Sequence, residues 1–275
     1  MKAIARALAD AARQLGKASD TARLDSELLM AEALHIDRDR LILSPPDRQV
    51  PKRFWEMVER RLAGEPVAYI TGRRAFWNIE LHVGPGVLVP RPDSEVLISA
   101  AIEHFGEGAA PARILDLGTG PGTLLLAALD IWPKATGLGV DLSRQALTYA
   151  AANARRLGFE DRVKLLQGNW AEGLVETFDL ILCNPPYVRE DAELGPGVRE
   201  FEPDEALFAG AEGLDAYRAL APQLARLLNA GGLAAVEIGH DQTAAVIGLL
   251  ACDGLGAEVA QDLGGRDRAV LLTWG

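Results

Sequence analysis

The sequence predicts an α/β protein in which a doubly wound, mainly parallel sheet follows a small all-helical domain. Two observations carry this prediction. From residue 112 onward, short apolar runs typical of buried strands alternate with segments of helical periodicity. Over residues 1–64, apolar side chains recur at helical spacing. A chain of 275 residues, of which 49% are hydrophobic and 24% charged, is long enough for two ordinary domains.

Residues 1–64 are predicted to form three or four short helices. Apolar residues recur at three- and four-residue spacing over residues 4–15 and 24–33, which gives each segment one apolar face. A third helix is indicated over residues 54–62, where aromatic and aliphatic residues precede a glycine. An all-helical stretch of this length, followed by alternating strands and helices, predicts a separate N-terminal domain over residues 1–72.

A pair of short strands is expected to connect this bundle to the rest of the chain. After residue 69 the pattern changes to period two, and the composition changes to aromatic and β-branched residues. Residues 76–83 and 87–89 are the expected strands, and Gly84-Pro85-Gly86 is the expected turn between them. We therefore assign residues 73–90 to a β-hairpin connector.

Residues 91–275 form the predicted α/β part, with seven strands. Five of them are nearly continuous apolar runs, which is typical of a parallel sheet covered by helices on both faces. The last two are joined by a polar loop and are expected to pair antiparallel. The five lie at 113–117, 135–140, 163–166, 178–183 and 233–238, the last two at 256–260 and 269–273, and the helices at 93–105, 122–130, 143–157, 214–229 and 241–252.

Charge and composition disfavour several classes of protein. With 28 basic and 39 acidic residues, the formal net charge of −11 opposes binding through many nucleic-acid phosphates. No window reaches the roughly 18 uninterrupted apolar residues that a membrane span requires. Arg6 and Asp10 interrupt the stretch that a signal peptide would need. We therefore expect a cytoplasmic protein with no membrane association and no direct nucleic-acid partner.

Metal and disulfide chemistry are not expected either. Cys183 and Cys252 are too few for a disulfide framework or a thiolate metal site. The four histidines, at positions 35, 82, 104 and 240, lack metal-ligand spacing. Near the start of the helix at 93–105, Arg91 and Asp93 leave two alternatives open. They either form an ion pair with each other or shape a pocket.

A glycine-rich turn follows the first strand of the predicted sheet. The strand leads into Gly118-Thr119-Gly120-Pro121-Gly122 at the start of a helix. Glycines let a ligand approach the backbone closely, and the free N–H groups of a helix N-terminus favour an anionic group. The next strand ends at Asp141, where a carboxylate can accept both hydroxyls of a ribose. The glycine spacing is not that of the G-x-G-x-x-G dinucleotide fingerprint.

A second loop, Asn184-Pro185-Pro186-Tyr187, follows the apolar strand at 178–183. In an open parallel sheet, ligands bind beyond the carboxyl ends of the strands. Asn184 offers a side-chain carbonyl, and Pro185 offers a backbone carbonyl outside any regular helix. Pro186 stiffens the loop, and Tyr187 presents a flat face. Two acceptors and a flat face fit a planar NH2 group.

The glycine turn followed by Asp141 resembles the S-adenosylmethionine-dependent methyltransferases of the seven-stranded, doubly wound class, over about residues 112–275. The resemblance implies S-adenosylmethionine as cofactor and S-adenosylhomocysteine as product. It places the turn against the methionine part of the cofactor, Asp141 on the ribose, Trp170 beside the adenine and Asn184 within reach of the cofactor.

Two positions depart from the pattern of this class. Asn169 stands where an acidic residue is common, and Pro121 stands where a small or hydroxyl residue is common. Asparagine keeps a carbonyl that can accept a hydrogen bond from the adenine amino group. Proline suits the first turn of a helix. We therefore expect cofactor binding to survive both departures, with its affinity most open to change at Asn169.

The second loop resembles that of the amino-methyltransferases, which methylate exocyclic amines of bases or side-chain amides. An amide nitrogen is a poor nucleophile because its lone pair is delocalised into the carbonyl. Hydrogen bonds accepted from both N–H groups would aim this nitrogen at the sulfonium methyl and stabilise the positive charge that develops on it. The resemblance makes Asn184, Pro185 and Tyr187 the expected catalytic residues, and with Pro186 they form the expected substrate-binding loop.

Blocks outside this loop narrow the resemblance to the peptide chain release factor N5-glutamine methyltransferase family. They include Gly-Glu-Pro and Pro-Arg-Pro-Asp-Ser-Glu, and they lie at 64–72, 76–77, 89–95, 201–203 and 237–242. This resemblance implies methyl transfer to the side-chain amide of the glutamine in the Gly-Gly-Gln loop of release factors. It also implies a monomer whose N-terminal bundle docks a different surface of the release factor.

Three alternatives remain open from the sequence. A sister family that methylates a glutamine of a ribosomal protein shares the Asn-Pro-Pro-Tyr loop and the Gly-Glu-Pro block, but lacks the form seen at residues 90–95. An adenine-N6 nucleic-acid methyltransferase would need a basic groove, which the net charge of −11 disfavours. A non-catalytic binding module would bind the cofactor without releasing S-adenosylhomocysteine, and the complete second loop disfavours it.

Overall fold

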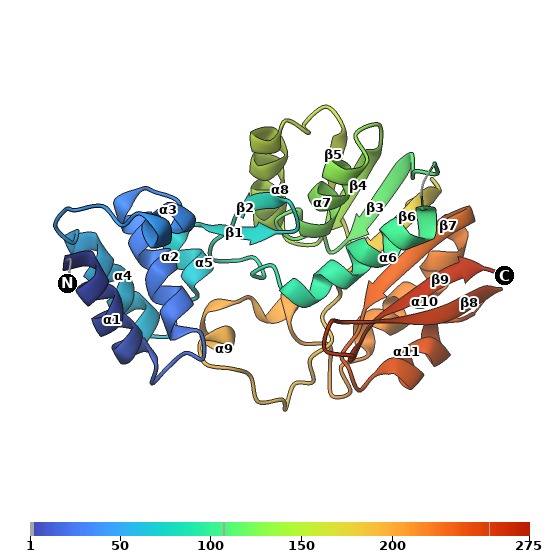
Figure 1. Cartoon of the computed structure of the whole chain (residues 1–275). Helices are drawn as coiled ribbons and strands as arrows, with labels where there is room; N and C mark the ends of the chain where they lie inside the picture. The colour runs from blue at the N-terminus through green and yellow to red at the C-terminus, as the bar shows by residue number, and fades with distance from the viewer. Residues whose placement is uncertain (1–2, 107, 253) are drawn as a thin grey trace. The chain divides into compact units, whose positions relative to one another are not determined.

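The computed structural model describes residues 3–106, 108–252 and 254–275. The chain divides into two compact units, named here the helical unit and the sheet unit (Figure 1). The helical unit comprises Met1–Arg73, Val83–Pro85 and Glu193–Glu202. The sheet unit comprises Arg74–His82, Gly86–Ala192 and Pro203–Gly275. Two short segments from later in the chain therefore belong to the same unit as the N-terminal helices.

The helical unit is built on helices α1 to α5, which span Ala3–Leu15, Ala22–Leu34, Arg38–Leu43, Lys52–Leu62 and Val67–Thr71. α1 buries Ile4, Ala7, Ala11 and Leu15, which are three or four residues apart and share one face. These residues join one apolar core with Leu29 of α2. The three predicted helices are confirmed as α1, α2 and α4. The short helices α3 and α5 add to them, because fewer than two turns show little periodicity.

Three acidic side chains of α2 are buried, and each has an arginine partner. Asp25 accepts a hydrogen bond from Nε of Arg61 at 2.8 Å. The other pairs are Glu27 with Arg38, at 2.8 Å, and Glu32 with Arg53, at 2.9 Å. A buried carboxylate that loses its partner keeps its desolvation cost without the compensating attraction. These pairs therefore hold α2 to the helices around it.

Replacing Arg61 with alanine is expected to lower the free energy of unfolding by about 3 kcal/mol. The side chains of Arg61 and Asp25 are only 16% and 6% exposed, so the change leaves a buried carboxylate without a charged partner. The hydroxyls of Ser19 and Thr21 still donate to it. Lys52→Ala is the control, because the Lys52–Glu56 pair is 92% and 55% exposed and should contribute less than about 1 kcal/mol. Urea unfolding followed by circular dichroism measures both, and equal losses would contradict this account.

A hairpin lies within the predicted connector, but its strands and its turn differ from the prediction. The predicted strand at 76–83 contains the turn itself, and residues 87–89 do not form a strand. β1 (Arg73–Phe76) and β2 (Ile79–His82) form a two-stranded sheet. The predicted turn at Gly84-Pro85-Gly86 is wrong, because the chain reverses at Trp77-Asn78. The backbone N–H of Trp77 donates to Oε1 of Glu95 at 3.1 Å, and Trp77 has a left-handed φ of 51°. This tertiary hydrogen bond helps to fix the turn, and local sequence patterns do not reveal it.

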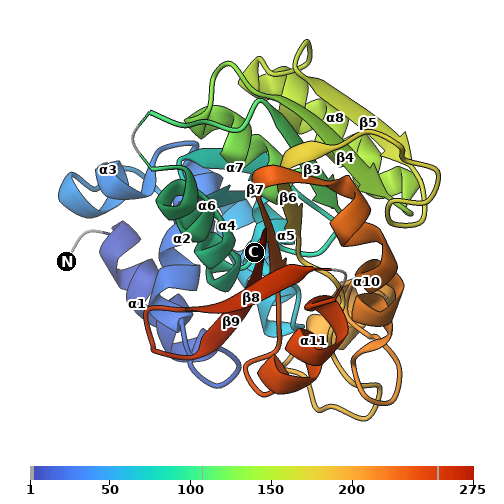
Figure 2. The ribbon, with the colours of Figure 1, turned by 90° about the vertical axis from the view of Figure 1, so that its right-hand side faces the viewer.

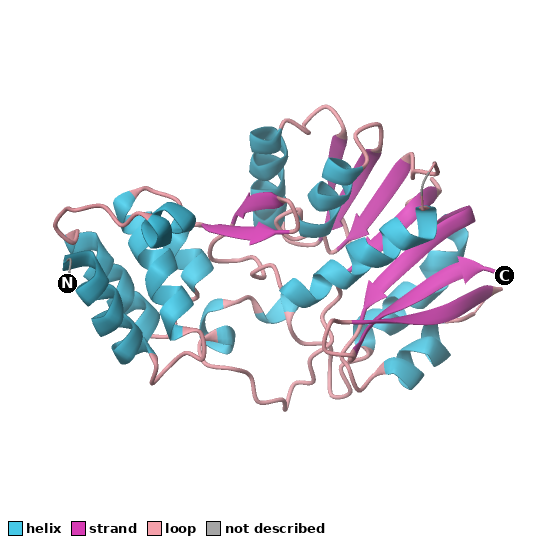
Figure 3. Ribbon diagram, in the orientation of Figure 1, coloured by secondary structure: helices cyan, strands magenta, loops and turns pink. Residues whose placement is uncertain are grey.

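A seven-stranded sheet of order β5-β4-β3-β6-β7-β9-β8 forms the centre of the sheet unit (Figure 3). The strands β3 to β9 span Arg113–Leu117, Thr136–Asp141, Val163–Gln167, Phe178–Cys183, Leu228–Glu237, Leu255–Gln261 and Asp267–Trp274. β3 to β7 pair in parallel, and β9 pairs antiparallel with β7 and β8, which confirms the predicted sheet. β7 starts at Leu228 rather than 233: Leu228 already pairs with Phe178, and the register with β6 then shifts before Leu180 pairs with Leu233.

Helices cover both faces of this sheet. α6, α7, α8, α10 and α11 span Glu95–Phe105, Thr123–Ile131, Arg144–Leu157, Asp215–Leu227 and Thr243–Leu250. Short 3-10 turns lie at Pro92–Ser94 (η1) and Asp204–Ala206 (η2). Right-handed crossovers place α7 and α8 on one face and α10 on the other, because β4 and β5 lie on one side of β3 while β6 and β7 lie on the other. α6 packs beside α7, and α11 packs beside α10 (Figure 2).

The strand order reverses at β3, which has β4 on one side and β6 on the other. The parallel register aligns Leu117, the last residue of β3, with Val140 of β4 and with Cys183 of β6. The carboxyl ends of these three strands therefore meet at one edge of the sheet. In open α/β sheets, ligands bind in the crevice at such a point.

The segment Glu193–Glu202, which contains α9 (Val198–Phe201), follows the second loop in sequence and belongs to the helical unit. It lies against the turn at Gly64. A Cβ on Gly197 would overlap the backbone oxygen of Gly64, and Gly197 has a φ of 80°. Only glycine accommodates both the close approach and this left-handed conformation. The two backbones are therefore packed directly on each other.

None of the helices in residues 3–106, 108–252 and 254–275 combines the length and the apolar character that crossing a membrane requires. Over the same ranges, no three His, Cys, Asp or Glu side chains are grouped so that they could hold a metal ion.

Candidate active site

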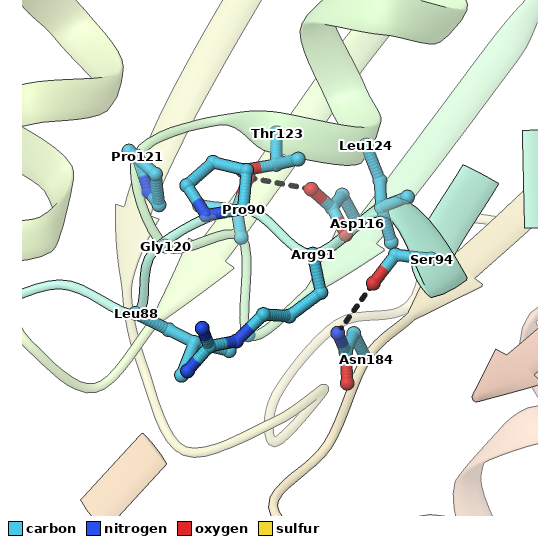
Figure 4. Close-up of a pocket in the computed structure, with 12 residues that line it drawn as sticks. Leu88, Pro90, Arg91, Ser94, Asp116, Gly120, Pro121, Thr123, Leu124 and Asn184 are labelled. Carbon is cyan, nitrogen blue, oxygen red and sulfur yellow. Dashed lines mark hydrogen bonds between the residues drawn. The ribbon is translucent and has the colours of Figure 1, made fainter. Parts of the chain in front are cut away.

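A pocket lies at the carboxyl ends of β3 and β6 (Figure 4). Three segments form its walls: the glycine turn after β3, the start of the loop after β6, and the segment that leads into α6. It is lined by Leu88, Pro90, Arg91, Ser94, Asp116, Gly118, Thr119, Gly120, Pro121, Thr123, Leu124 and Asn184. The two loops singled out in the sequence therefore line one pocket. Gly122, Asp141, Trp170 and the residues after Asn184 lie outside this lining.

The glycine turn lies against Trp170 and the second loop. A Cβ on Gly118 would be 3.6 Å from Cζ3 of Trp170 and 3.8 Å from the backbone oxygen of Asn184. Gly118 has a φ of 71°, which an L side chain rarely adopts. The backbone N–H groups of Gly118 and Thr119 donate to the carbonyl of Val140 at 2.9 and 3.0 Å. The turn is therefore anchored to β4, and the backbone of Gly118 lies close to Trp170 and to Asn184.

Asp141 joins the end of β4 to this turn. Its Oδ2 accepts the Gly120 N–H at 2.7 Å, and its Oδ1 accepts the Ser143 N–H at 2.8 Å. Burial raises the pKa of the Asp141 carboxyl, and these two hydrogen bonds oppose the rise. Each carboxylate oxygen carries a second lone pair, so both can still accept a hydroxyl. Asp141 can thus hold the turn and a ribose at the same time.

The segment after β5 carries Asn169 and Trp170. Trp170 is half-buried and has a left-handed φ of 52°. The exposed Asn169 donates its Nδ2 to Oε1 of Glu172 at 2.7 Å. Since the amide nitrogen is engaged in this bond, the carbonyl Oδ1 is the acceptor that Asn169 can offer to a ligand.

Asp116, next to the last residue of β3, is a pocket residue that the sequence prediction missed. It is 1% exposed, and its Oδ2 accepts hydrogen bonds from the Thr119 hydroxyl at 2.7 Å and the Leu125 N–H at 3.2 Å. Its Oδ1 is buried without a partner among the described residues. Burial raises the pKa of Asp116 to about 7, and the nearby Asp141 charge adds to the rise. A carboxylate inside an apolar strand could have drawn attention to it.

Asn184 is held in one orientation at the start of the second loop. Its Nδ2 donates to Oγ of Ser94 at 2.9 Å, and its Oδ1 points away from Ser94 (Figure 4). Pro185 is buried, and Pro186 is half-buried. The carbonyl of Asn184 is therefore the end of the amide that can accept a hydrogen bond from a ligand.

Tyr187 is anchored at both its backbone and its hydroxyl. Its backbone carbonyl accepts Nε2 of Gln242 at 3.0 Å, and its hydroxyl donates to Oε1 of Glu237 at 3.3 Å. Burial, reinforced by the Glu237 charge, raises the pKa of Tyr187, so its hydroxyl stays protonated near neutral pH. The loop is thus fixed at its last residue as well as at Asn184.

Arg91 and Asp93, which precede α6, have different surroundings in the structure. Arg91 lines the pocket, as one of the two alternatives from the sequence expected. Asp93 pairs with Arg268 of β9, with 2.9 Å between Oδ2 and Nη2. The segment before α6 therefore contributes one cation to the pocket and one anion to an ion pair with β9.

The sheet order, the glycine turn and the acidic end of β4 define a class of enzyme, the S-adenosylmethionine-dependent methyltransferases. Residues 6–72 match the family model for the PrmC N-terminal domain, and residues 110–240 match a methyltransferase domain model. This chain belongs to the release factor glutamine methyltransferase family, and its cofactor is S-adenosylmethionine.

Two relatives support this assignment, and a solved structure shares the fold. A release factor glutamine methyltransferase of Caulobacter vibrioides is 41% identical over 259 residues, which cover 92% of this chain and 89% of the relative. One of Moorella thermoacetica is 40% identical over 273 residues and 96% of each chain. The T. thermophilus 16S rRNA N2 G1207 methyltransferase, solved with AdoMet and guanosine, has a TM-score of 0.53 at 20% identity, over 74% of this chain and 50% of its own. That likeness shows the fold.

Proposed function

We propose that this protein transfers the methyl group of S-adenosylmethionine to the side-chain amide nitrogen of the glutamine in the Gly-Gly-Gln loop of peptide chain release factors. Relatives named release factor glutamine methyltransferase, at about 40% identity along nearly the whole chain, support this substrate. One geometric observation carries the chemistry. Asn184, beside the glycine turn, turns its carbonyl away from Ser94 and can accept an amide N–H.

The residues around the pocket fit each part of the cofactor. The unpartnered Oδ1 of Asp116 suits the ammonium of the methionine part, which would approach across the bare backbone of Gly118. Asp141 would hold the ribose hydroxyls. Asn169 and Trp170 would lie beside the adenine. The bound cofactor supplies an electrophilic methyl group on a positively charged sulfur.

The second loop would hold the substrate amide. Oδ1 of Asn184 and the backbone carbonyl of Pro185 would each accept one amide N–H, while the ring of Tyr187 would pack on the amide plane. Both acceptors would favour the positive charge that develops on the nitrogen as the new C–N bond forms and the bond between the methyl carbon and the sulfur breaks, so this interaction would strengthen in the transition state. S-adenosylhomocysteine would be the leaving group, and the methylated nitrogen would then lose one proton to solvent. No strong base is then needed before attack. Holding the reactants in line contributes on the order of 7 to 11 kcal/mol.

The N-terminal bundle, residues 1–72, would dock the release factor, with residues 73–90 as connector and 91–275 as the catalytic part. The net charge of −11 favours a protein over a nucleic acid as the partner. We further propose that the enzyme acts in the cytoplasm, since its substrate takes part in translation, and that it acts as a monomer.

Incubation with labelled S-adenosylmethionine and a purified release factor tests the proposed function. We expect one methyl group on the glutamine of the Gly-Gly-Gln loop, located by mass mapping of the peptides. A release factor with alanine in place of that glutamine is the control and should stay unlabelled. Ribosomal protein and duplex DNA are included as competing substrates. Label on either of these, with none on the release factor, would overturn the proposal.

A further inference from the structure

A buried cluster of hydrogen-bonding side chains lies behind Asn184. We name it the carboxyl cluster, and it consists of Ser94, Tyr187 and Glu237. Ser94 in η1 is 2% exposed, and Glu237 at the end of β7 is 1% exposed. The hydroxyls of Ser94 and Tyr187 both bond to the Glu237 carboxyl. The other oxygen of Glu237, Oε2, is buried without a partner in the described part of the chain.

The hydrogens of this cluster determine how the Asn184 amide is turned. A serine hydroxyl has one hydrogen to donate and lone pairs with which to accept. When Glu237 is ionised it can only accept, so the Ser94 hydrogen goes to Glu237. Oγ of Ser94 must then accept from Asn184, and the atom that does donate is Nδ2, at 2.9 Å. The Asn184 carbonyl is thereby left for the substrate.

We propose that Glu237 is a positioning residue that fixes, through the single hydrogen of Ser94, which end of the Asn184 amide faces the substrate. This inference rests on the proposed function. A protonated Glu237 would donate its own hydrogen to Ser94. Ser94 would then donate to Oδ1 of Asn184, and the amide would turn its NH2 toward the substrate N–H groups. Two donors would face each other, and turnover would be lost.

Turnover should therefore decrease at acid pH, and this decrease is named here the acid limb of the pH profile. Burial raises the pKa of Glu237 to about 7, while the hydrogen bonds from Ser94 and Tyr187 oppose the rise. The active form is the ionised one, so kcat should fall as the pH drops below about 7. The charged and titratable groups that face Glu237 are Asp93 of η1, Cys183 of β6, Tyr187 of the second loop, Tyr217 of α10 and Arg268 of β9.

The test is kcat measured against pH for wild type and Glu237→Gln, at saturating S-adenosylmethionine and release factor. Below about pH 7 we expect wild-type kcat to fall roughly tenfold per pH unit. Glutamine does not titrate, so the variant should have the same kcat from about pH 6 to 8. Glu160→Gln, an exposed change on the sheet unit, should keep the wild-type profile. The same acid limb in Glu237→Gln would overturn the proposal.

Two further variants keep the test decisive if Glu237→Gln does not fold. Tyr187→Phe removes one donor to the carboxylate, so the acid limb should move to higher pH, and an unmoved limb counts against the proposal. Ser94→Ala removes the hydroxyl that connects Glu237 to Asn184. The value of kcat should fall about 10- to 100-fold, and its pH profile should lose the acid limb. The Kd of the cofactor, measured by calorimetry, should change little. Failure of wild type to methylate release factor would refute the proposed function, whereas an active wild type with a limb unaffected by these variants would refute this inference alone.

Discussion

Replacing Asn184 with alanine is expected to lower kcat by about 100- to 1000-fold, which corresponds to ~2.7–4 kcal/mol of transition-state stabilisation. The variant loses the side-chain carbonyl of Asn184. The hydrogen bond from Nδ2 of Asn184 to Oγ of Ser94, at 2.9 Å, holds this carbonyl in one orientation. A preorganised acceptor stabilises charge that develops only during the reaction, so the loss should appear in kcat more than in KM. Single-turnover methylation of a release factor with saturating cofactor measures it.

Asn229→Ala is the matched control for this variant. Asn229 is also half-buried, and its Nδ2 also makes a side-chain hydrogen bond, at 2.8 Å to Asp179. It lies outside the pocket lining, so its loss should leave kcat close to that of wild type. Near-normal turnover of Asn184→Ala would refute the assigned role of Asn184.

Asp141→Ala is expected to weaken cofactor binding by about 100-fold while the fold stays intact. Two ribose hydroxyls would lose hydrogen bonds to a carboxylate, and bonds to charged groups contribute roughly 1.5–3 kcal/mol each. The Gly120 N–H also loses its acceptor, which lies 2.7 Å away, so the turn that contacts the methionine part should loosen. Titration calorimetry with S-adenosylhomocysteine measures the affinity, and circular dichroism checks the fold.

The control for this change is Asp130→Ala on α7. Asp130 is exposed and lies at the opposite end of α7 from the glycine turn. Its removal should leave the affinity for S-adenosylhomocysteine unchanged. An unchanged affinity in Asp141→Ala would contradict the ribose-binding role of Asp141.

The central strands of the sheet could be predicted because they are buried on both faces and read as nearly continuous apolar runs. β3 and β6 have the predicted bounds, Arg113–Leu117 and Phe178–Cys183. Their burial is nearly complete along the whole strand. The glycine turn and the second loop could be located because each directly follows one of these runs. The roles given to their residues stay predictions until the variants above are measured.

Features that depend on contacts between distant parts of the chain could not be predicted. The hairpin turn is stabilised by Glu95, which lies beyond the hairpin. Ser94 meets Asn184 only because the sheet brings the carboxyl end of β6 to the start of α6. Asp116 has an environment set by β3, Thr119 and α7 together. Local patterns carry no information about such meetings, so the network behind Asn184 emerged only from the structure.

The interlocked glycines at 64 and 197 set a limit on how this protein can be divided experimentally. A fragment that begins after Arg73 would deprive Glu193–Glu202 of the backbone on which it rests, although that segment lies far along the chain. A transplanted bundle would need its matching ten-residue insert from the same donor. Chimeras between relatives should therefore exchange both pieces together, with one junction on each side of the insert.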